Sequence, residues 1–350
     1  MKLIWEIPYD FIGIGITTTP LLLGDSLVIM TAGKDLVAIE QKSGSIRWRS
    51  FVSMETNLQT DELKTDGTLL FATHVQDVRA YRISDGGLQW LVNMPEERGG
   101  FWSDEIAYES GRLYVSGYRT VYCLDGVTGN LLWSRKLQDR GLLGSVKLFQ
   151  NDVVIGGGYG VDDSNGVLVG IISRMYMLSG LSGDTLWTRS ATGDGDITKI
   201  AVDDSVVYEG THFPFSTGSF LALSLPMGSL KWNYSTPGQG WDYNDVITVG
   251  DKVIANAGPY NVCAFKKSTG ELLWRTFVRE DAESRKLHYY DGYIYHTQGW
   301  RLYVIDPNTG NIVHSMNGPT GQALVTLAVE NGRVFVQGHP SLQCYEAYKP

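Results

Sequence analysis

The sequence has little cysteine, no long apolar run and no excess of basic charge. Its three cysteines are too few and too scattered for a disulfide framework, so we expect Cys123, Cys263 and Cys344 to be buried free thiols. No apolar run approaches the roughly 20 residues that a membrane-spanning helix needs. A formal net charge of −9 and a pI near 5.2 argue against a nucleic-acid-binding surface, which is basic.

Two further features are missing from the chain. The amino terminus lacks the charged start, apolar core and small-residue cleavage site of a signal peptide. If Met1 is the natural start, we expect a cytoplasmic protein; the alternative is a periplasmic or extracellular protein whose signal peptide has been removed. The six histidines show no metal-ligand spacing, so no metal site is expected.

What the chain has instead is a repeat. An aromatic position recurs seven times, each time four residues after a glycine, and six of the seven aromatics are tryptophan. The period between successive positions is 42, 43, 54, 45, 42 and 40 residues. The tryptophans are Trp48, Trp90, Trp133, Trp187, Trp232 and Trp274, and the seventh position is His314; the glycines are Gly44, Gly86, Gly129, Gly183, Gly228, Gly270 and Gly310.

Each period contains four short runs rich in Val, Ile, Leu and Tyr, separated by Gly, Asp and Asn. Such runs are typical of strands joined by tight turns, and no stretch has the periodicity of a long helix. Four antiparallel strands in a repeat of about 40 residues indicate a blade of a β-propeller. The sequence therefore predicts an all-β protein.

The two ends of the chain give the number of blades. Residues 318–350 supply three strands of a further unit, and the chain then stops. The strand predicted over 3–7 contains Trp5, which lies 43 residues before Trp48. Pairing it with the last unit closes the ring and leaves no open sheet edge. We expect one domain over 1–350, an eight-bladed propeller closed by its amino-terminal strand.

The repeated tryptophans are interpreted as structural. A large flat side chain between neighbouring blades holds a ring of this kind together, because its burial removes much apolar surface from water. We expect His314 to be a polar substitute at a weaker junction. The predicted blade-docking residues are Trp5, Trp48, Trp90, Trp133, Trp187, Trp232 and Trp274.

The segment from Cys123 to Trp133, with Asp125, Thr128 and Gly129 between them, resembles the tryptophan-docking repeat of the pyrroloquinoline-quinone (PQQ)-type propellers. The resemblance extends over essentially the whole chain. It implies an eight-bladed ring that is used both by quinone-dependent alcohol dehydrogenases and by non-catalytic proteins such as the propeller lipoprotein of outer-membrane assembly. Fold alone does not choose between these functions.

Strand order shows which loops share an end of the ring. The first-to-second and third-to-fourth turns of every blade lie at one end and are uniformly tight. The second-to-third loops and the blade-to-blade crossings lie at the other end, where the chain departs from its repeat. Aromatic and Arg side chains on such loops are typical of recognition surfaces. The candidate binding residues on this end are Arg98, Trp102, Asp104, Phe213, Phe215, Trp241, Asp242, Tyr243 and Trp300.

Two strings at this end invite sharper hypotheses. Trp241-Asp242-Tyr243 resembles the segment that carries the proposed catalytic base in PQQ alcohol dehydrogenases, which would make Asp242 the base beside a bound quinone and Ca²⁺. An adjacent Cys-Cys pair and recognisable Ca²⁺-holding Glu and Asn segments are missing from the sequence. The glycine-rich string 156–166 lacks the spacing of a calcium loop and opens no helix, so we interpret it as an extended hairpin.

These observations favour a non-catalytic scaffold that docks a protein or peptide partner, within a larger assembly, without a cofactor and without nucleic acid. The alternative is a PQQ- and calcium-dependent alcohol or sugar dehydrogenase. A third option is a hydrolase or lyase that uses acidic residues at the channel mouth. These residues are Glu55, Asp61, Glu62, Asp104, Asp196 and Asp245.

Overall fold

The computed structural model describes most of the 350-residue chain. The described residues are 1–8, 18–32, 35–52, 63–74, 77–94, 106–137, 141–162, 168–194, 196–212, 219–235, 245–257, 260–278, 284–318, 324–338 and 341–350.

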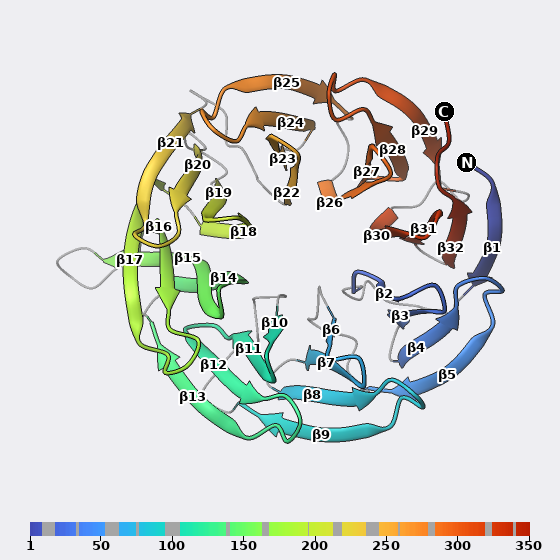
Figure 1. The fold of residues 1–350 in the computed structure, drawn as a ribbon, viewed down its shortest axis with the longest axis horizontal. Coiled ribbons are helices and arrows are strands. Elements are labelled where there is room, and N and C mark those ends of the chain that lie inside the picture. Colours follow the sequence, from blue (N-terminus) through green and yellow to red (C-terminus); the bar gives the residue numbers. More distant parts are fainter. Residues whose placement is uncertain are drawn as a thin grey trace.

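Eight four-stranded antiparallel sheets form a closed ring around a central axis (Figure 1). In each sheet the first strand lies nearest the axis and the fourth lies at the rim. Blade 1 contains β2 (Leu21–Leu23), β3 (Leu27–Ala32), β4 (Asp35–Glu40) and β5 (Ile46–Phe51). Blade 2 contains β6 (Lys64–Thr65), β7 (Leu69–His74), β8 (Asp77–Arg82) and β9 (Leu88–Asn93). Blade 3 contains β10 (Ile106–Glu109), β11 (Arg112–Ser116), β12 (Thr120–Asp125) and β13 (Leu131–Lys136).

The remaining five blades follow the same order. Blade 4 contains β14 (Gly141–Phe149), β15 (Asp152–Asp162), β16 (Leu168–Leu178) and β17 (Thr185–Asp194). Blade 5 contains β18 (Asp196–Asp203), β19 (Val206–His212), β20 (Ser219–Ser224) and β21 (Ser229–Ser235). Blade 6 contains β22 (Val246–Val249), β23 (Lys252–Asn256), β24 (Asn261–Lys266) and β25 (Leu272–Phe277). Blade 7 contains β26 (Ser284–Tyr290), β27 (Tyr293–Gln298), β28 (Arg301–Ile305) and β29 (Ile312–Asn317). Blade 8 contains β30 (Leu324–Glu330), β31 (Arg333–Gly338), β32 (Ser341–Glu346) and, from the other end of the chain, β1 (Leu3–Pro8).

The amino-terminal strand closes the ring, as the sequence predicted. β1 pairs antiparallel with β32, with Trp5 opposite Cys344 and Ile7 opposite Leu342. The carboxylate of Glu6 reinforces this pairing, because its Oε1 accepts hydrogen bonds from Ser341 Oγ (2.5 Å) and Gln343 Nε2 (2.9 Å). These hydrogen bonds lower the pKa of Glu6. The predicted all-β, eight-bladed fold is confirmed.

Each tryptophan of the repeat lies in the seam between its own blade and the next. The indole of Trp48, for example, donates a hydrogen bond from Nε1 to the carbonyl of Ile83 in blade 2 at 2.8 Å. The other six follow the same rule, with N···O distances of 2.7 to 3.1 Å: Trp5 to Gln41, Trp90 to Gly126, Trp133 to Gly180, Trp187 to Leu225, Trp232 to Lys267 and Trp274 to Pro307.

The indole packs against the repeat's glycine in the following blade, and we call this glycine its seat. A Cβ atom on Gly86 would lie 2.5 Å from Cε3 of Trp48, a distance that real Cβ contacts do not show. Gly86 also has a φ of 72°, in the left-handed region that favours glycine. The repeated glycine therefore satisfies two requirements, a turn conformation and the close approach of an aromatic ring from the neighbouring blade.

This double requirement gives a testable stability difference between two glycines. Gly86→Ala should cost about 1–2 kcal/mol for the left-handed backbone and a further ~1–3 kcal/mol for overpacking against Trp48. Gly332 has the same φ of 72° but nothing within 4 Å of its Cβ position, so Gly332→Ala should incur only the first cost. Urea unfolding of both variants measures the difference; equal losses would show that the indole does not use Gly86 as its seat.

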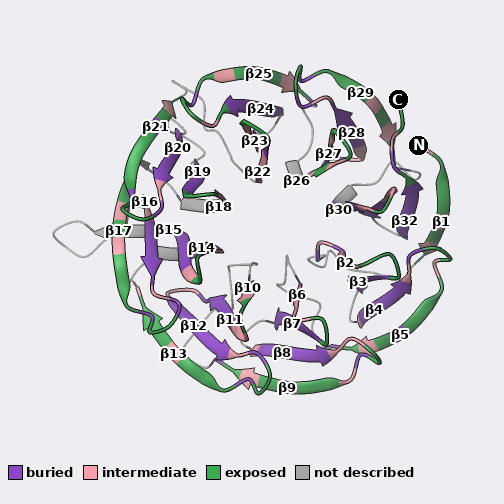
Figure 2. Cartoon of the chain, viewed as in Figure 1, coloured by how far each residue is buried: buried purple, intermediate pink, exposed green. Residues whose placement is uncertain are grey.

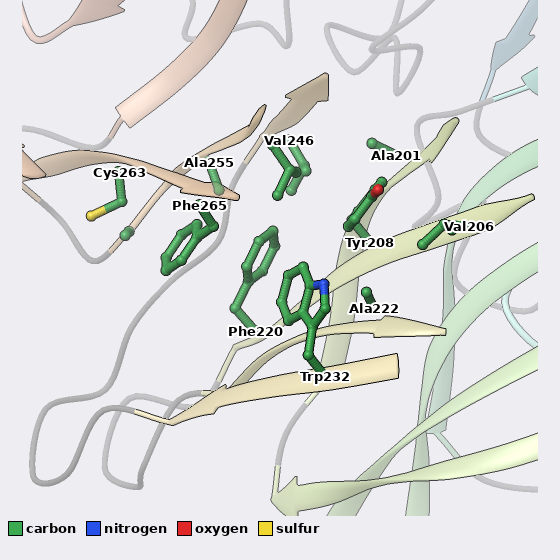
Figure 3. Packing of buried hydrophobic residues seen from close by; sticks show 12 residues of the cluster. Ala201, Val206, Tyr208, Phe220, Ala222, Trp232, Val246, Ala255, Cys263 and Phe265 are labelled. Atoms are coloured by element: carbon green, nitrogen blue, oxygen red, sulfur yellow. The ribbon is translucent and has the colours of Figure 1, made fainter. Parts of the chain in front are cut away.

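The core consists of these seams, so most of the buried residues lie on the second and third strands (Figure 2). In the seam between blades 5 and 6, Trp232 lies beside Phe220, which in turn contacts Phe265 (Figure 3). The ring centroids are 5.8 Å and 5.0 Å apart. All three cysteines are buried free thiols in this core, as expected, and burial raises the pKa of Cys263 to about 12.

The seam after blade 7 has a different composition. Blade 8 has no glycine turn between its third and fourth strands, because those strands come from opposite ends of the chain. His314 stacks instead on Tyr348 of the carboxyl-terminal segment, with ring centroids 5.6 Å apart. Burial and the nearby amino terminus both lower the pKa of His314. The position deviates from tryptophan because its usual seat does not exist here.

Blade 4 accounts for the long fourth period. Strands β15 and β16 have 11 residues each and pair as an extended hairpin from Val153 and Leu178 out to Asp162 and Leu168. In Figure 1 this hairpin reaches beyond β17 at the left edge of the ring. The glycine-rich string 156–166 therefore contributes strand β15 to the hairpin over its described part.

Candidate functional site

One end of the ring, which we call the loop face, carries the eight crossings between blades and the second-to-third loops. Twelve residues separate β1 from β2, β5 from β6 and β9 from β10. The other crossings have 4, 1, 10, 6 and 6 residues. The three longest crossings therefore enter three consecutive blades, 1, 2 and 3. The opposite end, the turn face, has only tight turns.

Most of the predicted binding residues lie on these crossings and loops. Arg98, Trp102, Asp104, Phe213, Phe215, Trp241, Asp242 and Tyr243 lie outside the described residues, as do Glu55, Asp61 and Glu62. Their positions at the loop face remain a prediction from strand order.

Three candidate residues are described. Trp300 lies in the turn between β27 and β28, is half-buried, and accepts a hydrogen bond at its carbonyl from Gly318 N at 2.7 Å. Asp196 begins β18 opposite His212. Asp245 precedes β22, and its carboxylate accepts hydrogen bonds from the backbone N–H groups of Leu287 (2.7 Å) and Val246 (3.1 Å). Asp245 therefore links blade 6 to blade 7.

Sequence reasoning missed a ring of buried polar positions near the loop face. In each blade, one third-strand residue pairs with the tryptophan or its equivalent on the fourth strand, and also with a residue of the second strand. In blade 1 these are Ala38, Trp48 and Ile29. The buried polar position follows that second-strand residue by two and faces the next blade. The eight members, which we call the polar ring, are Thr31, Thr73, Ser116, Gly156, Gly210, Asn256, Thr297 and Gln337.

Several atoms of the polar ring are buried without a hydrogen-bond partner among the described residues. They are Ser116 Oγ, both amide atoms of Asn256, Thr297 Oγ1 and Gln337 Oε1. Buried polar atoms of this kind normally bond to ordered water or to a ligand. The signal was present in the sequence as a polar residue or glycine at the end of each apolar second strand, but alignment by tryptophan did not reveal it.

A charged cluster occupies the same end of the seam between blades 1 and 2. Arg79 forms a bidentate ion pair with Asp77, at 2.6 Å from Nε to Oδ1 and 2.8 Å from Nη2 to Oδ2. Its Nη1 donates to the carbonyl of Val52, the first residue of the crossing into blade 2, at 2.6 Å. Burial alone would raise the pKa of Asp77, but His74 and Arg79 outweigh burial and lower it.

His74 completes this cluster. Its Nδ1 lies 3.0 Å from Arg79 Nη2, which can only donate a hydrogen bond, and 3.4 Å from Asp77 Oδ2, which can only accept one. His74 is only 7% exposed, and Nε2 is buried without a partner among the described residues.

Glu209 is an isolated buried acid in the seam between blades 4 and 5. Its side chain is 1% exposed and its Oε2 has no hydrogen-bond partner within the described part of the chain. Burial raises the pKa of Glu209 to about 8, although the charge of Arg189 acts in the opposite direction. Burial therefore favours the neutral, protonated carboxyl group.

A family model described as "Outer membrane protein assembly factor BamB" matches residues 74–243, 139–291 and 260–347. The chain belongs to this family. Among solved structures, BamB from Moraxella catarrhalis is similar over 98% of this chain and 99% of its own, with a TM-score of 0.72 and 18% identity. At that identity the likeness shows the fold alone.

The chain is also similar to enzymes. A quinohemoprotein alcohol dehydrogenase from Pseudomonas putida HK5 matches 80% of this chain and 63% of its own, with a TM-score of 0.67 and 14% identity. A tetrathionate hydrolase from Acidithiobacillus ferrooxidans is 24% identical over 68% of this chain and 48% of its own length. The chain thus spans about half the length of that relative.

Within the described residues, no three His, Cys, Asp or Glu side chains gather in a way that could hold a metal ion. The regular elements described are all strands, and none of the described residues forms a helix long and apolar enough to cross a membrane.

Proposed function

We propose that this BamB-family propeller is a non-catalytic scaffold whose loop face docks a protein partner within a multiprotein assembly. The observation that carries the proposal is the asymmetry of the ring. The turns of the turn face have two to six residues, whereas the crossings of the loop face have one to twelve, and strand order predicts that the candidate aromatic residues belong to the loop face. Recognition surfaces are built in this way, with variable loops on a rigid scaffold. The family's description as an assembly factor supports it.

The PQQ and Ca²⁺ alternative requires a donor set for the cation. Asp242, its proposed base, lies outside the described residues. The nearby described carboxylate, Asp245, is already bonded to two backbone N–H groups. Among the described residues, no three His, Cys, Asp or Glu side chains gather in a way that could hold a metal ion, and no catalytic step is assigned. Incubation with PQQ and Ca²⁺ followed by dye-reduction assays on alcohols and sugars tests this alternative.

The scaffold proposal is tested by a triple substitution on the loop face. Trp102→Asp, Phe213→Asp and Trp241→Asp together should abolish recovery of partner proteins from the native host, because desolvated aromatic anchors supply most of the affinity of such interfaces. The thermal transition should be unchanged.

The control replaces three exposed apolar residues of the outer strands. Leu88, Leu131 and Leu186 lie at the starts of β9, β13 and β17, beside the turn face, and are 51%, 54% and 51% exposed. Substituting Asp at these three sites should leave partner recovery intact. Recovery that survives the loop-face triple, or is lost equally in the control, would contradict the proposal.

The same proposal bears on location. A role in outer-membrane protein assembly would place the chain in the periplasm rather than in the cytoplasm. Fractionation of the native host, with detection of the chain by antibody, decides between the two compartments.

A further inference from the structure

Blades 6 and 7 are neighbours in the ring (Figure 1), and polar side chains line the loop-face end of the seam between them. Asn256 faces this seam from blade 6, because Ile254, two residues earlier on β23, belongs to the hydrophobic cluster of the seam. From blade 7, Tyr303 belongs to the same cluster and pairs with His296. Side chains alternate along a strand and paired residues share a face, so Arg301, two residues before Tyr303, also faces blade 6.

Most polar groups at this end of the seam have partners. His296 Nδ1 lies 3.0 Å from the carbonyl oxygen of Lys286, and His296 Nε2 lies 3.2 Å from Gln298 Oε1. The backbone N–H of Asn256 donates a hydrogen bond to the carbonyl of Asp245 at 3.1 Å. The carboxylate of Asp245 accepts two backbone N–H groups, one of them from blade 7. These bonds join the two blades without using the side-chain amide of Asn256.

Two side chains that face each other across the seam have unsatisfied polar atoms. Asn256 is fully buried, yet neither its Nδ2 nor its Oδ1 forms a hydrogen bond with a described residue. Arg301 Nε is buried and unbonded in the same way, and Arg301 forms no ion pair within the described part of the chain. Two donors and one acceptor therefore remain unused, and buried groups of this kind normally bond to water or to a ligand.

Arg301 connects these atoms to the outside of the molecule, because it is only half-buried. In blade 2, Arg79 uses the edge formed by Nε and Nη2 to bind the carboxylate of Asp77. In blade 4, Arg174 occupies the position equivalent to Arg301, and its Nε donates to Ser190 Oγ at 3.4 Å. Arg301 thus has a free carboxylate-binding edge at a position where the arginine of blade 4 is bonded.

We propose that this end of the seam binds the carboxyl terminus of a partner polypeptide. The terminal carboxylate accepts hydrogen bonds from Arg301 and from Asn256 Nδ2, and the N–H of the same terminal residue donates to Asn256 Oδ1. Arginine binds a carboxylate through two parallel hydrogen bonds, which a lysine cannot form. A chain terminus carries the carboxylate and the neighbouring donor within one residue, whereas an acidic side chain lacks that donor.

The inference rests on the proposed docking function of the loop face and adds the chemistry of the partner. Trp300, the candidate aromatic residue of the loop face that the structure describes, immediately precedes Arg301 in the turn between β27 and β28. Tryptophan and arginine are the residues that most often dominate the affinity of a protein interface. The site therefore lies within the surface already proposed to bind the partner.

The test uses the full chain and N-acetylalanine, a small molecule with the carboxylate and the N–H of a chain terminus. Ligand-observed NMR titrations at constant ionic strength measure its affinity. N-acetylalaninamide, which has no carboxylate, should not bind. Propionate has a carboxylate but no N–H, so it should bind on the order of tenfold more weakly than N-acetylalanine, because Asn256 Oδ1 stays unsatisfied.

Substitutions at the two equivalent arginines provide the matched comparison. Arg301→Gln should weaken binding of N-acetylalanine on the order of tenfold or more, because it removes a charge-assisted pair of hydrogen bonds. Arg301→Lys should restore little of this loss, since lysine lacks the two-donor edge. Arg174→Gln removes the same charge from blade 4 and should leave the affinity within about twofold of the wild type.

Asn256→Leu tests the buried amide. The variant should bind N-acetylalanine on the order of tenfold more weakly, because one donor and one acceptor of the site are lost. Thermal unfolding shows whether the variant is folded. A folded variant with unchanged affinity would show that the amide bonds only to internal water, which contradicts the proposed site.

Three further results would overturn the inference: no binding of N-acetylalanine, equal binding of N-acetylalaninamide or propionate, or equal losses in Arg301→Gln and Arg174→Gln. Its failure is distinguishable from failure of the docking function. If the aromatic triple variant loses its partner but N-acetylalanine does not bind, the loop face docks its partner without capturing a chain terminus.

Discussion

Removing residues 1–8 is expected to destabilise the protein so far that it becomes insoluble or melts at least about 10 °C lower. The deletion removes the outer strand of blade 8 and leaves the edge of β32 unpaired. It also removes Trp5 from the seam with blade 1, where the indole lies on Gly44. Burial of one tryptophan contributes on the order of 4–6 kcal/mol as an upper bound, a large part of the 5–15 kcal/mol that typically stabilises a protein.

The measurement is thermal unfolding of the truncated chain with and without a synthetic peptide of residues 1–8. The peptide should raise the melting temperature in a concentration-dependent way, because it binds the folded ring and not the unfolded chain. A peptide with Trp5→Ala should be much less effective. A truncated chain as stable as the parent would show that the strand does not close the ring.

Glu209→Gln is expected to remove a pH dependence of the free energy of unfolding that amounts to several kcal/mol. The pKa of Glu209 is about 8 in the folded protein and 4.5 as its ordinary value. Between these values the unfolded chain releases a proton that the folded protein retains, so the stability of the wild type falls as pH rises. The total loss by pH 8 is roughly 4–5 kcal/mol for an acid this deeply buried. Below the ordinary value both states are protonated and the loss disappears.

Denaturant unfolding at several pH values measures this effect. The stability of Glu209→Gln relative to the wild type should increase steadily from about pH 5 to about pH 8 and then level off. Glu271→Gln, at an exposed position on blade 6, is the matched control and should follow the wild type. A constant difference across this range would mean that Glu209 ionises normally in its seam.

The seam tryptophans explain why this fold could be predicted from a single sequence. Trp48 and its equivalents recur because every blade presents the same surface to its neighbour, and a position used that often leaves a periodic signal. Strand order then follows from antiparallel pairing alone, and with it the assignment of crossings to one face. The fold and the loop face were therefore predictable, including the closing strand around Trp5.

The chemistry inside the seams was not predictable in the same way. His74, Asp77 and Arg79 lie close in sequence. The sequence does not show that Arg79 also donates a hydrogen bond to Val52 of the preceding blade, because only tertiary packing brings these two residues together. Glu209 is an ordinary acid in the sequence, and only the apolar seam between blades 4 and 5 removes it from water.

The sequence by itself determined the number of blades, the order of their strands and the end of the ring that carries the variable loops, because these follow from periodicity and from pairing between neighbours in the chain. Only the tertiary structure decided which groups are desolvated and which partners they meet across a seam. It showed that the glycine before each tryptophan is the seat for the indole of the preceding blade, and that His314 deviates because its seat would fall where the chain begins and ends. The physical reason is that contacts across a seam join residues about 27 or more positions apart, so no local sequence pattern shows which residues face each other across it.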